Sequence, residues 1–458
     1  MKTYNILKLI VGMLLPLILP AQAPDTLWTR IYNKSDWDEG YSIKQANDGG
    51  YVVCGETNLY GNDNYQIYII KTDANGDTVW TRCYGGSNDE LATSVEKTSD
   101  NCYVIVGWTT SYGAGGHDIY LLKINQQGDA LWTSTYGGLD YDFAWDVAEV
   151  AGNGYIIAGV TESLSDSFGD VYLIKTDNVG SIVWSKTYGG DNVDVGSHVQ
   201  QTYDGGFMIA GWTISSGAGS VDFYLIKTDS LGDTLWTRTY GGDSMDVCYS
   251  AQQTLDSGFI MVGLTTSFGA GAGDVYLVKT NSNGDTTWSK TYGGSASEVG
   301  FSVQQTQDNG YIICGGTNSY GMGNTDVYLI RVDPWGNLLW SATYGEADFM
   351  DEGYCVQTTS DNGYIISGYK ESVYTGDRDI YLVRTAPDET HIRENNVICT
   401  PHNNKLPAIF SGPLQLPKDK KCRVFDITGR IVMPNIIKPG VYFIQIDGKM
   451  VNKIIKVK

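Results

Sequence analysis

The sequence predicts an all-β fold: a seven-bladed β-propeller with four-stranded blades, closed by an N-terminal strand and followed by a small β-sandwich domain. Three observations carry this prediction. A Trp-[Thr/Ser]-x-x-Tyr segment returns every 52 residues, each period holds four short strand-like runs, and the two ends of the array complement each other. Such a period is typical of a propeller blade. The tryptophans that mark it are Trp28, Trp80, Trp132, Trp184, Trp236, Trp288 and Trp340.

Each period reads as four strands joined by tight turns. The first turn carries Asp-Gly-Gly or a close variant, a hairpin signal that needs a positive φ. The third turn reads Asp-x-x-Gly-Asp, in which the first aspartate can bond its own backbone and the glycine takes the left-handed conformation. In the second period the expected strands are residues 92–97, 103–109, 117–123 and 130–136.

The ends of the array determine the number of blades. A lone fourth strand, residues 25–32, precedes the first complete period. The seventh period stops after three strands, at residues 353–358, 364–368 and 379–384. Pairing the surplus strand with the incomplete blade removes two exposed sheet edges, which otherwise invite aggregation. The sequence therefore predicts seven blades in a closed ring.

The repeat resembles a known family. The segments Asp-[Val/Ile]-Tyr-Leu-[Ile/Val]-Lys-Thr-Asp, Trp-[Thr/Ser]-x-Thr-Tyr-Gly-Gly and Asp-Gly-Gly-[Tyr/Phe]-x-x-x-Gly-x-Thr are similar to bacterial extracellular β-propeller repeats, often called SBBP repeats. The resemblance covers residues 25 to about 388. It implies the propeller fold and says almost nothing about chemistry.

The N-terminus predicts a signal peptide over residues 1–23. Lys2 and Lys8 flank a short basic region, residues 7–19 are almost wholly apolar, and Ala21-Gln22-Ala23 supplies small residues for cleavage. Because Pro24 follows Ala23, cleavage after Ala21 is an equally good alternative. No other stretch is long enough to span a bilayer, so we expect no transmembrane anchor. The propeller is expected over residues 24–388.

Residues 389–458 differ in character from the repeats. From His391 to the end, Lys and Arg outnumber Asp and Glu by 12 to 4. The segments Val-Phe-Asp-Ile-Thr-Gly-Arg-Ile-Val, Lys-Pro-Gly-Val-Tyr-Phe-Ile-Gln-Ile and the terminal Lys-Ile-Ile-Lys-Val-Lys resemble the C-terminal sorting domain of the type IX secretion system of Bacteroidetes-like bacteria. The family usually opens with Tyr-Pro-Asn-Pro, where this chain has Thr-Pro-His-Asn. The resemblance implies the type IX secretion machinery as a partner; an ordinary small β-sandwich is the alternative.

Composition narrows the classes of function. The net charge is −21, and without a basic patch the acidic body argues against nucleic-acid binding. The eight cysteines fall at scattered repeat positions, so they are expected as small buried side chains; Cys399 and Cys422 are the one pair worth checking for a disulfide. The four histidines show no metal-ligand spacing, and residues 36–40 lack a complete calcium-loop pattern, so no metal or cofactor is predicted.

Because the period is constant, equivalent residues should form rings around the propeller axis. One ring is acidic in every copy and is expected beside the innermost strands, at one mouth of the channel. It can bind cations or catalyse acid–base chemistry on a glycan, or it can serve each repeat by bonding backbone N–H groups. An acid in all seven copies favours the structural role. The ring is Asp38, Glu90, Asp142, Asp194, Asp246, Glu298 and Asp351.

In a repeat protein, a specific function is expected where the copies differ. Irregular aromatic residues occur on the face opposite the tight turns, beside the acidic ring. Such rings suit a sugar or a protein edge, or they pack neighbouring loops together. The candidate ligand-binding residues are Trp37, Trp108, Tyr141, Trp212 and Tyr369.

These observations predict a secreted or cell-surface, non-enzymatic propeller. We expect it to pass through the periplasm and a type IX secretion system, and to present one loop face to an unidentified glycan or surface protein. The alternative is a glycan-active hydrolase or lyase that uses the carboxylates at the mouth. An enzyme should carry an unrepeated acid or base in one blade, and the sequence shows no convincing one.

Overall fold

The computed structural model describes residues 22–58, 64–151, 154–165 and 168–388, together with short stretches between residues 408 and 456. All regular secondary structure in the described residues is β. The first three blades contain β2 (Asp38–Gln45), β3 (Tyr51–Asn58), β4 (Tyr65–Thr72), β5 (Thr78–Tyr84), β6 (Glu90–Lys97), β7 (Tyr103–Thr109), β8 (Asp118–Ile124), β9 (Ala130–Tyr136), β10 (Asp142–Glu149), β11 (Tyr155–Thr161), β12 (Asp170–Thr176) and β13 (Ile182–Tyr188).

The next three blades repeat the pattern, and the seventh combines both ends of the propeller segment. Blades 4 to 6 contain β14 (Asp194–Gln201), β15 (Phe207–Thr213), β16 (Asp222–Thr228), β17 (Thr234–Tyr240), β18 (Asp246–Gln253), β19 (Phe259–Thr265), β20 (Asp274–Thr280), β21 (Thr286–Tyr292), β22 (Glu298–Gln305), β23 (Tyr311–Thr317), β24 (Asp326–Val332) and β25 (Leu338–Tyr344). Blade 7 contains β26 (Phe349–Thr358), β27 (Tyr364–Ser372), β28 (Arg378–Thr385) and β1 (Thr26–Tyr32).

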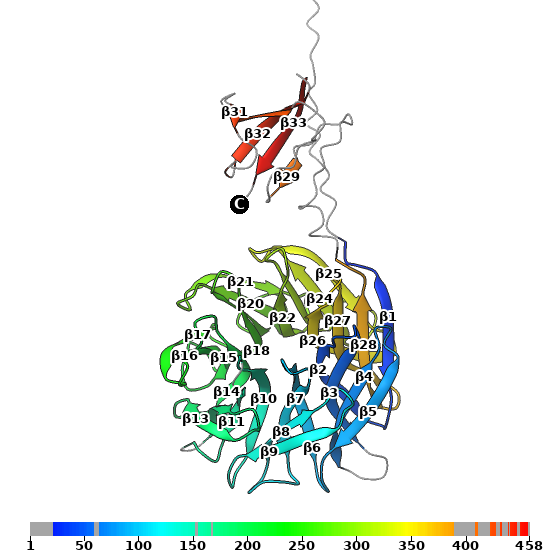
Figure 1. Ribbon diagram of the computed structural model, residues 1–458, viewed down its shortest axis with the longest axis vertical. Coiled ribbons are helices and arrows are strands. Elements are labelled where there is room, and N and C mark those ends of the chain that lie inside the picture. Colours follow the sequence, from blue (N-terminus) through cyan, green and yellow to red (C-terminus); the bar gives the residue numbers. More distant parts are fainter. Residues whose placement is uncertain are drawn as a thin grey trace, which may run out of the picture.

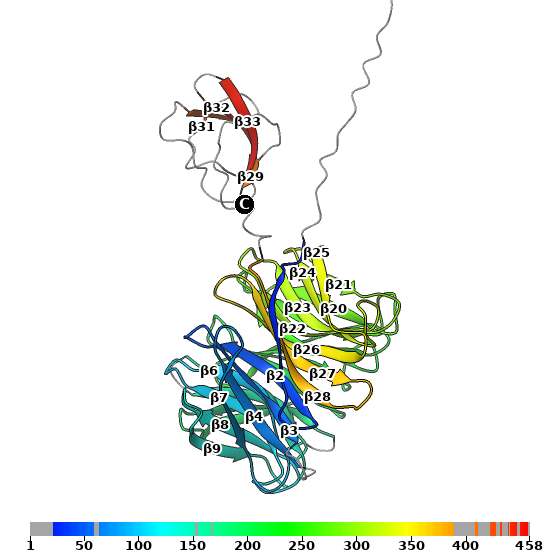
Figure 2. The same ribbon diagram turned by 90° about the vertical axis from the view of Figure 1, so that its right-hand side faces the viewer.

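Each blade is a four-stranded antiparallel sheet, and the seven sheets form a ring (Figure 1). The first strand of every blade contacts the first strands of both neighbouring blades, so these strands surround the axis. In blade 7, β1 pairs antiparallel with β28, placing Trp28 opposite Arg384 and Tyr32 opposite Ile380. The predicted seven-bladed ring with its N-terminal closing strand is confirmed. Figure 2 shows blades 1 and 7 side by side at this closure.

The repeated Trp and Tyr join each blade to the next. The Trp ring of a fourth strand meets an aromatic ring on the second strand of the following blade, as in Trp184 and Phe207, whose centroids are 5.8 Å apart. Four residues later the Tyr hydroxyl donates to a turn carbonyl of that same blade in six of the repeats, as Tyr136 does to Gly180 O at 2.6 Å, whereas the Tyr344 hydroxyl has no such partner. The hallmark of the repeat is therefore an inter-blade contact, which explains its recurrence.

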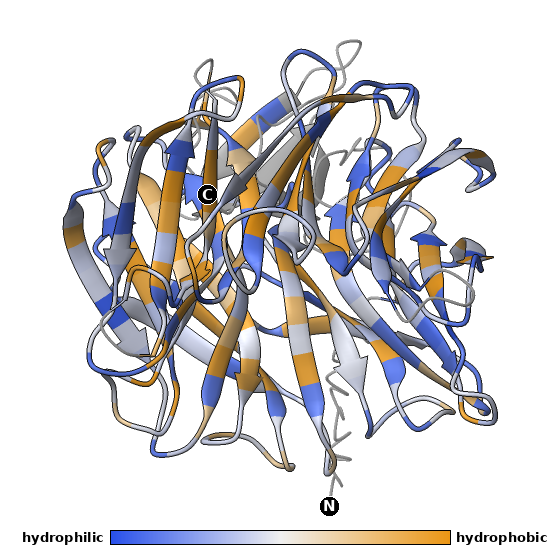
Figure 3. Ribbon diagram, turned by 90° about the horizontal axis from the view of Figure 1, so that it is seen from below, coloured by the Kyte–Doolittle hydropathy of each residue, from blue (hydrophilic) through white to orange (hydrophobic). Residues whose placement is uncertain are grey.

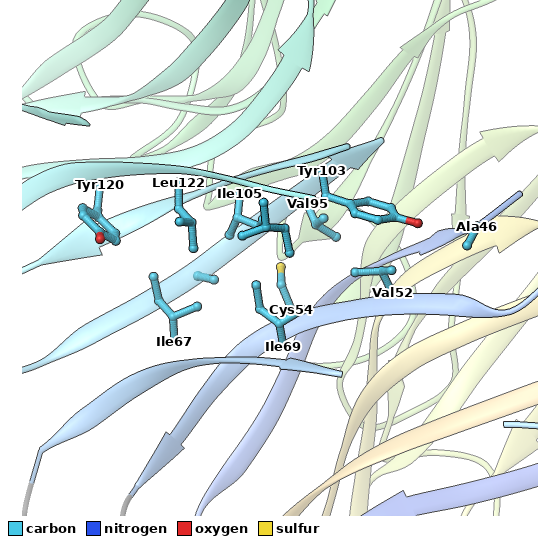
Figure 4. Close-up of a cluster of buried hydrophobic side chains, with 12 residues drawn as sticks. Ala46, Val52, Cys54, Ile67, Ile69, Val95, Tyr103, Ile105, Tyr120 and Leu122 are labelled. Carbon is cyan, nitrogen blue, oxygen red and sulfur yellow. The ribbon is translucent and has the colours of Figure 1, made fainter. Parts of the chain in front are cut away.

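Hydrophobic side chains fill the spaces between the blades. In Figure 4, Val52 and Ile69 of blade 1 lie against Ile105, Tyr103 and other residues of blade 2. Figure 3 shows that hydrophobic segments run along the strands of the blades. Both faces of the two middle strands of each sheet are thereby buried, as stacked blades require.

The two tight turns have the predicted conformations. Gly49 in the first turn and Gly76 in the third have φ values of 83° and 81°. Oδ1 of Asp73 accepts hydrogen bonds from the backbone N–H groups of Asn75 and Asp77 at 2.8 and 2.9 Å. The first-turn aspartate also pairs with a buried cation of the third strand, as Asp48 does with Lys71 at 2.8 Å.

The described strands of the C-terminal region form one five-stranded sheet, in the order β29-β33-β32-β30-β31. They are β29 (Ala408–Phe410), β30 (Cys422–Asp426), β31 (Ile431–Val432), β32 (Gly440–Ile446) and β33 (Lys449–Lys456). The sequence predicts a small β-sandwich here, and the described residues form one sheet of it.

Several sequence predictions concern residues outside the part of the chain that the structure describes. The hydrophobic core of the predicted signal peptide and Cys399 lie outside the described residues, as does the side chain of Cys422. Six cysteines of the propeller are free thiols, among them the buried Cys54, Cys248 and Cys314. Within the described residues, no helix is long and apolar enough to cross a membrane.

Candidate functional site

Exposed apolar side chains occur at both ends of the propeller, and those in the tight turns include Leu231, Leu255 and Trp335. We call the end formed by the second-to-third-strand and fourth-to-first-strand connections the loop face, and the opposite end the turn face. Exposed apolar side chains occur on the loop face in blades 2 to 7, and Leu139 and Tyr374 are the most exposed, at 81% and 78%. The exposed apolar residues of the loop face are Tyr112, Leu139, Tyr141, Leu164, Phe168, Ile214, Met245, Phe268, Tyr320, Met322, Val373 and Tyr374.

The acidic ring lies beneath this surface rather than on it. Each of its carboxyl groups belongs to the first residue of an innermost strand or lies within one, and all seven residues are buried. Oδ2 of Asp194 accepts hydrogen bonds from Gly190 N at 2.8 Å and Ser215 Oγ at 2.7 Å. Asp142 and Asp246 are held in the same way. This geometry favours the structural role, because the carboxylates satisfy loop N–H groups and do not face solvent.

A second ring of acids lies close to the first. At the junction of blades 6 and 7, Oδ1 of Asp326 and Oδ2 of Asp351 lie 2.0 and 2.8 Å from the position that a Cβ on Gly345 would take. At the junction of blades 1 and 2 the corresponding residue is Gln66, whose Nε2 donates to Oε2 of Glu90 at 3.1 Å. The amide supplies a hydrogen bond that an ionised carboxylate cannot. Burial, with a smaller contribution from Asp326, raises the pKa of Asp351 to about 7.

Asp351 lies beside another carboxyl group, whereas Glu90 lies beside an amide. Replacing the acid by its amide is therefore expected to have opposite effects on stability at these two positions. Unfolded Asp351 titrates near 3.8 and the folded group near 7, so the folded state loses stability as the pH rises through that window. We expect Asp351→Asn to raise the free energy of unfolding at pH 8 by about 1 kcal/mol, the value of one added hydrogen bond, and to lose this advantage at pH 4. Urea denaturation at both pH values measures it.

Glu90→Gln is the matched control for Asp351→Asn. Both oxygens of Glu90 already accept hydrogen bonds, from Gln66 and Gly86 at Oε2 and from Thr109 and Ser111 at Oε1. In Glu90→Gln the new side-chain NH2 group would face these hydrogen-bond donors and find no acceptor. We therefore expect the free energy of unfolding to fall by about 1 kcal/mol at both pH values. Equal losses in the two variants at pH 8 would contradict the role of the paired carboxylates.

Two of the predicted ligand-binding aromatics belong to one cluster between blades 2 and 3. Trp108 is half-buried and meets His117 edge-on, with ring centroids 4.6 Å apart. Tyr141 is exposed and lies 5.2 Å from the same histidine. Phe143 completes the group, 6.0 Å from Trp108. Burial lowers the pKa of His117, so the imidazole is neutral at pH 7 and this cluster is uncharged.

Two others lie at the closure, between blades 7 and 1. Trp37 is half-buried and Tyr369 is buried. The guanidinium of Arg378 lies between them, 3.9 Å from the Trp37 ring and 4.1 Å from the Tyr369 ring. Trp212, on β15, is half-buried and pairs across the sheet with Val195 and Phe223. The predicted residues therefore do not converge on one site.

The structure brings together a group that the sequence reasoning missed. Four glutamates surround Arg378 at the loop-face end of the axis: Glu39, Glu56, Glu352 and Glu371. We call them the glutamate cluster. Arg378 Nη1 donates to Glu39 Oε1, and its Nε donates to Glu371 Oε2 at 2.9 Å. These glutamates depart from the repeat, and the sequence analysis did not single them out.

The signal for this cluster was present in the sequence. The residue after each acid of the acidic ring is acidic in blades 1 and 7, at Glu39 and Glu352, and apolar in the other five blades. Those two blades are neighbours only because the ring closes. Glu39 also lies opposite Glu56 on the adjacent strand. The repeat alignment contained each residue, and the closure was needed to place them together.

The burial of the glutamate cluster alters its acidity. Glu56 is 7% exposed, and burial, followed by repulsion from Glu39, raises its pKa to about 7. Burial likewise raises the pKa of Glu352, opposed by Arg378. Perturbed carboxyl groups of this kind are candidates for a functional site. In the part of the chain that the structure describes, no group of three or more acidic, histidine or cysteine residues could hold a metal ion.

No protein-family model matches the chain. The chain is similar to a protein named regulatory protein FlaEY from Caulobacter vibrioides, with 25% identity over 283 residues that make up 48% of this chain and 29% of that protein. The chain therefore spans less than a third of the length of this relative, and the match assigns it to no family.

Two solved structures are similar to this chain over most of its length. The WD40 domain of Neurospora crassa Pan2 has 9% identity and a TM-score of 0.48, over 80% of this chain and 96% of that one. Sqt1 from Chaetomium thermophilum has 12% identity and a TM-score of 0.42, over 76% of this chain and 86% of that one. The strand pairing itself defines the class of this protein, a seven-bladed β-propeller closed by its N-terminal strand.

Proposed function

We propose that this chain is a secreted or cell-surface binding protein whose loop face holds a surface protein. The observation that carries the proposal is the set of exposed apolar side chains on that face, from Tyr112 to Tyr374. Soluble proteins rarely leave such residues gathered at one surface unless they contact a partner. The repeat itself accounts for Tyr112, Phe268 and Tyr320, which pack against a tyrosine of the third strand in their own blades. The other exposed residues of the loop face differ in type from blade to blade.

The distribution of these residues favours a protein over a glycan. They occur in six blades around the ring, whereas a sugar site usually gathers a few aromatic rings in one concavity. A stable protein interface buries about 800 Å² on each partner, which suits contacts spread over several blades. A glycan is the second candidate, since the exposed ring of Tyr141 and the half-buried ring of Trp108 both pack against His117 in one compact aromatic cluster.

Site-specific photo-crosslinking in the producing cell tests the proposal. We expect a benzoylphenylalanine at Leu139, Met322 or Tyr374 to yield a crosslinked product of one discrete mass. Exposed turn-face positions, Leu231 and Trp335, are the controls and should yield none. The combined Met322→Ser and Tyr374→Ser changes should abolish a crosslink from position 139 without lowering the melting temperature. Equal crosslinking from both faces would contradict the proposal.

We also propose that residues 389–458 direct export through a type IX secretion system. The support is the resemblance of the C-terminal segments and the change of charge that begins near His391. Deleting residues 395–458 should leave a folded propeller in the periplasm, because the described blade strands end at Thr385 and none pairs with the C-terminal sheet. Cell fractionation with a protease-protection assay measures this. The truncated protein at the cell surface in normal amount would contradict it.

The hydrolase alternative is tested on the same protein. Glu56 is one of two carboxyl groups, with Asp351, whose pKa is raised to about 7 by burial and suits a general acid. If the chain hydrolyses glycans, a polysaccharide panel should release reducing ends with the parent chain, and Glu56→Gln should abolish the release. We expect no release with either protein.

A further inference from the structure

The cations of the propeller are concentrated at the turn face. In six blades a lysine or arginine near the end of the third strand pairs with the aspartate of the first turn, at 2.5–3.0 Å. Two third-turn aspartates pair with a cation on the fourth strand of the preceding blade, as Asp233 does with Lys186 at 3.0 Å. Most acids in the turns of this face therefore have a cation beside them.

The loop face has acids without such cations. The connections that form it contain one lysine, Lys34, and no arginine. Lys34 is half-buried, as is Arg378 on an adjoining strand, and Lys370 is buried. Among the exposed acids of the described loop face, Glu346 alone forms an ion pair, with Lys370 at 2.8 Å. The exposed acids of this face are Asp36, Asp140, Glu162, Asp191, Asp243, Glu346 and Asp348.

These acids stand among the exposed apolar residues of the same face. Asp140 lies between Leu139 and Tyr141 in the sequence, and all three are exposed. Oδ1 of Asp348 accepts a hydrogen bond from the exposed Tyr374 hydroxyl at 2.9 Å. Ionised carboxylates repel phosphate groups, so nucleic acids and anionic lipid surfaces do not suit this face. A partner with cations around an apolar centre is complementary to it.

We propose that the surface protein that docks on the loop face contacts it through a basic face, on which lysine or arginine side chains surround apolar ones. This inference rests on the proposed function, because it defines the chemistry of the partner of that same surface. Complementary charge steers such a partner to the loop face, whereas the paired acids of the turn face attract it less. Leu139 and Tyr374 then supply apolar contact area, and the carboxylates beside them pair with the cations of the partner.

Peptide binding to the mature chain tests the preference for positive charge. The probe is a short amphipathic peptide of leucine and lysine, and its counterpart has glutamate in place of every lysine. Fluorescence anisotropy of the labelled peptides at low ionic strength should show that the lysine peptide binds at least tenfold more tightly. Its affinity should fall as salt is added, because salt screens exposed charges. Equal affinity for the two peptides overturns the inference.

Two matched triple variants show which face the lysine peptide uses. Each replaces three exposed aspartates by asparagine and so removes the same charge. The loop-face variant should weaken binding about tenfold and the turn-face control less than twofold, and melting temperatures near that of the parent show that both are folded. Equal effects of the two variants indicate a general attraction to an acidic protein and overturn the inference. The loop-face variant combines Asp140→Asn, Asp191→Asn and Asp243→Asn, and the turn-face control combines Asp77→Asn, Asp129→Asn and Asp285→Asn.

Photo-crosslinking in the producing cell separates this inference from the docking surface itself. A crosslink from position 322 or 374 that falls about tenfold in the loop-face variant, and that maps to a lysine- or arginine-rich segment of the partner, supports both. An undiminished crosslink in that variant leaves the docking surface standing and overturns the basic partner. No crosslink from any loop-face position overturns the docking surface, and this inference with it.

Discussion

Arg331→Met is expected to lower the free energy of unfolding by about 3–5 kcal/mol, the usual effect of breaking a buried ion pair. The Arg331 side chain is fully buried, and Nη2 lies 2.6 Å from Asp308 Oδ2 while Nε lies 3.3 Å from Asp388 Oδ2. Asp388 is equally buried and keeps a hydrogen bond from the Tyr364 hydroxyl at 2.6 Å. Arg331→Met therefore removes one ion-pair partner from each of two aspartates, one of which is fully buried. Urea denaturation at pH 7 measures the loss.

The equivalent change in blade 5 is the matched control. Lys279 pairs with Asp256 at 3.0 Å, and the side chain of Asp256 is largely exposed. Water can therefore solvate that aspartate, and we expect Lys279→Met to cost about 1–2 kcal/mol. Adding Asp388→Asn to Arg331→Met should recover part of the loss, because it removes the buried carboxylate that paired with the guanidinium. Equal costs at positions 331 and 279, with no recovery in the double variant, would show that the buried carboxylate is unimportant.

Features that every blade needs could be predicted from the sequence. The seven-fold Trp and Tyr, the Asp-Gly-Gly turn and the ring of acids recur because each blade meets the same neighbour, so each repeat supplies independent support for the same contact. Asp194 is buried and accepts a hydrogen bond from the backbone N–H of Gly190, as expected for an acid that every blade needs. Even the closing strand could be predicted, since one end lacks the strand that the other end has in excess.

Features that belong to a single junction were harder to predict. The glutamate cluster depends on Glu39, Glu352 and Arg378, whose positions in the chain are far apart and which meet only where the ring closes. Each is a minor departure from the repeat when its own blade is considered alone. Tyr369 was expected to face a ligand, yet the guanidinium of Arg378 lies over its ring. The side-chain contacts across the closure could be identified only from the three-dimensional structure.

Deleting residues 25–32 is expected to abolish most of the stability of the propeller, a loss on the order of 5 kcal/mol or more. The deletion leaves β28 as an unpaired edge in blade 7. It also removes the contact of Trp28 with Tyr51, at 6.0 Å between ring centroids, and the bond from the Tyr32 hydroxyl to Gly76 O at 2.6 Å. These contacts join blade 7 to blade 1. We therefore expect aggregation on size-exclusion chromatography and a much lower melting temperature.

A peptide of residues 24–33 supplied in solution should reverse these effects in a concentration-dependent way. The peptide can pair with β28 as β1 does, and a ligand that binds the folded state raises its stability by mass action. A peptide carrying Trp28→Ala is the control and should restore less at the same concentration, because it lacks the ring that packs against Tyr51. A monomeric deletion variant with the parental melting temperature would contradict the role of β1 in closing the ring, since the open edge of β28 would then carry no cost.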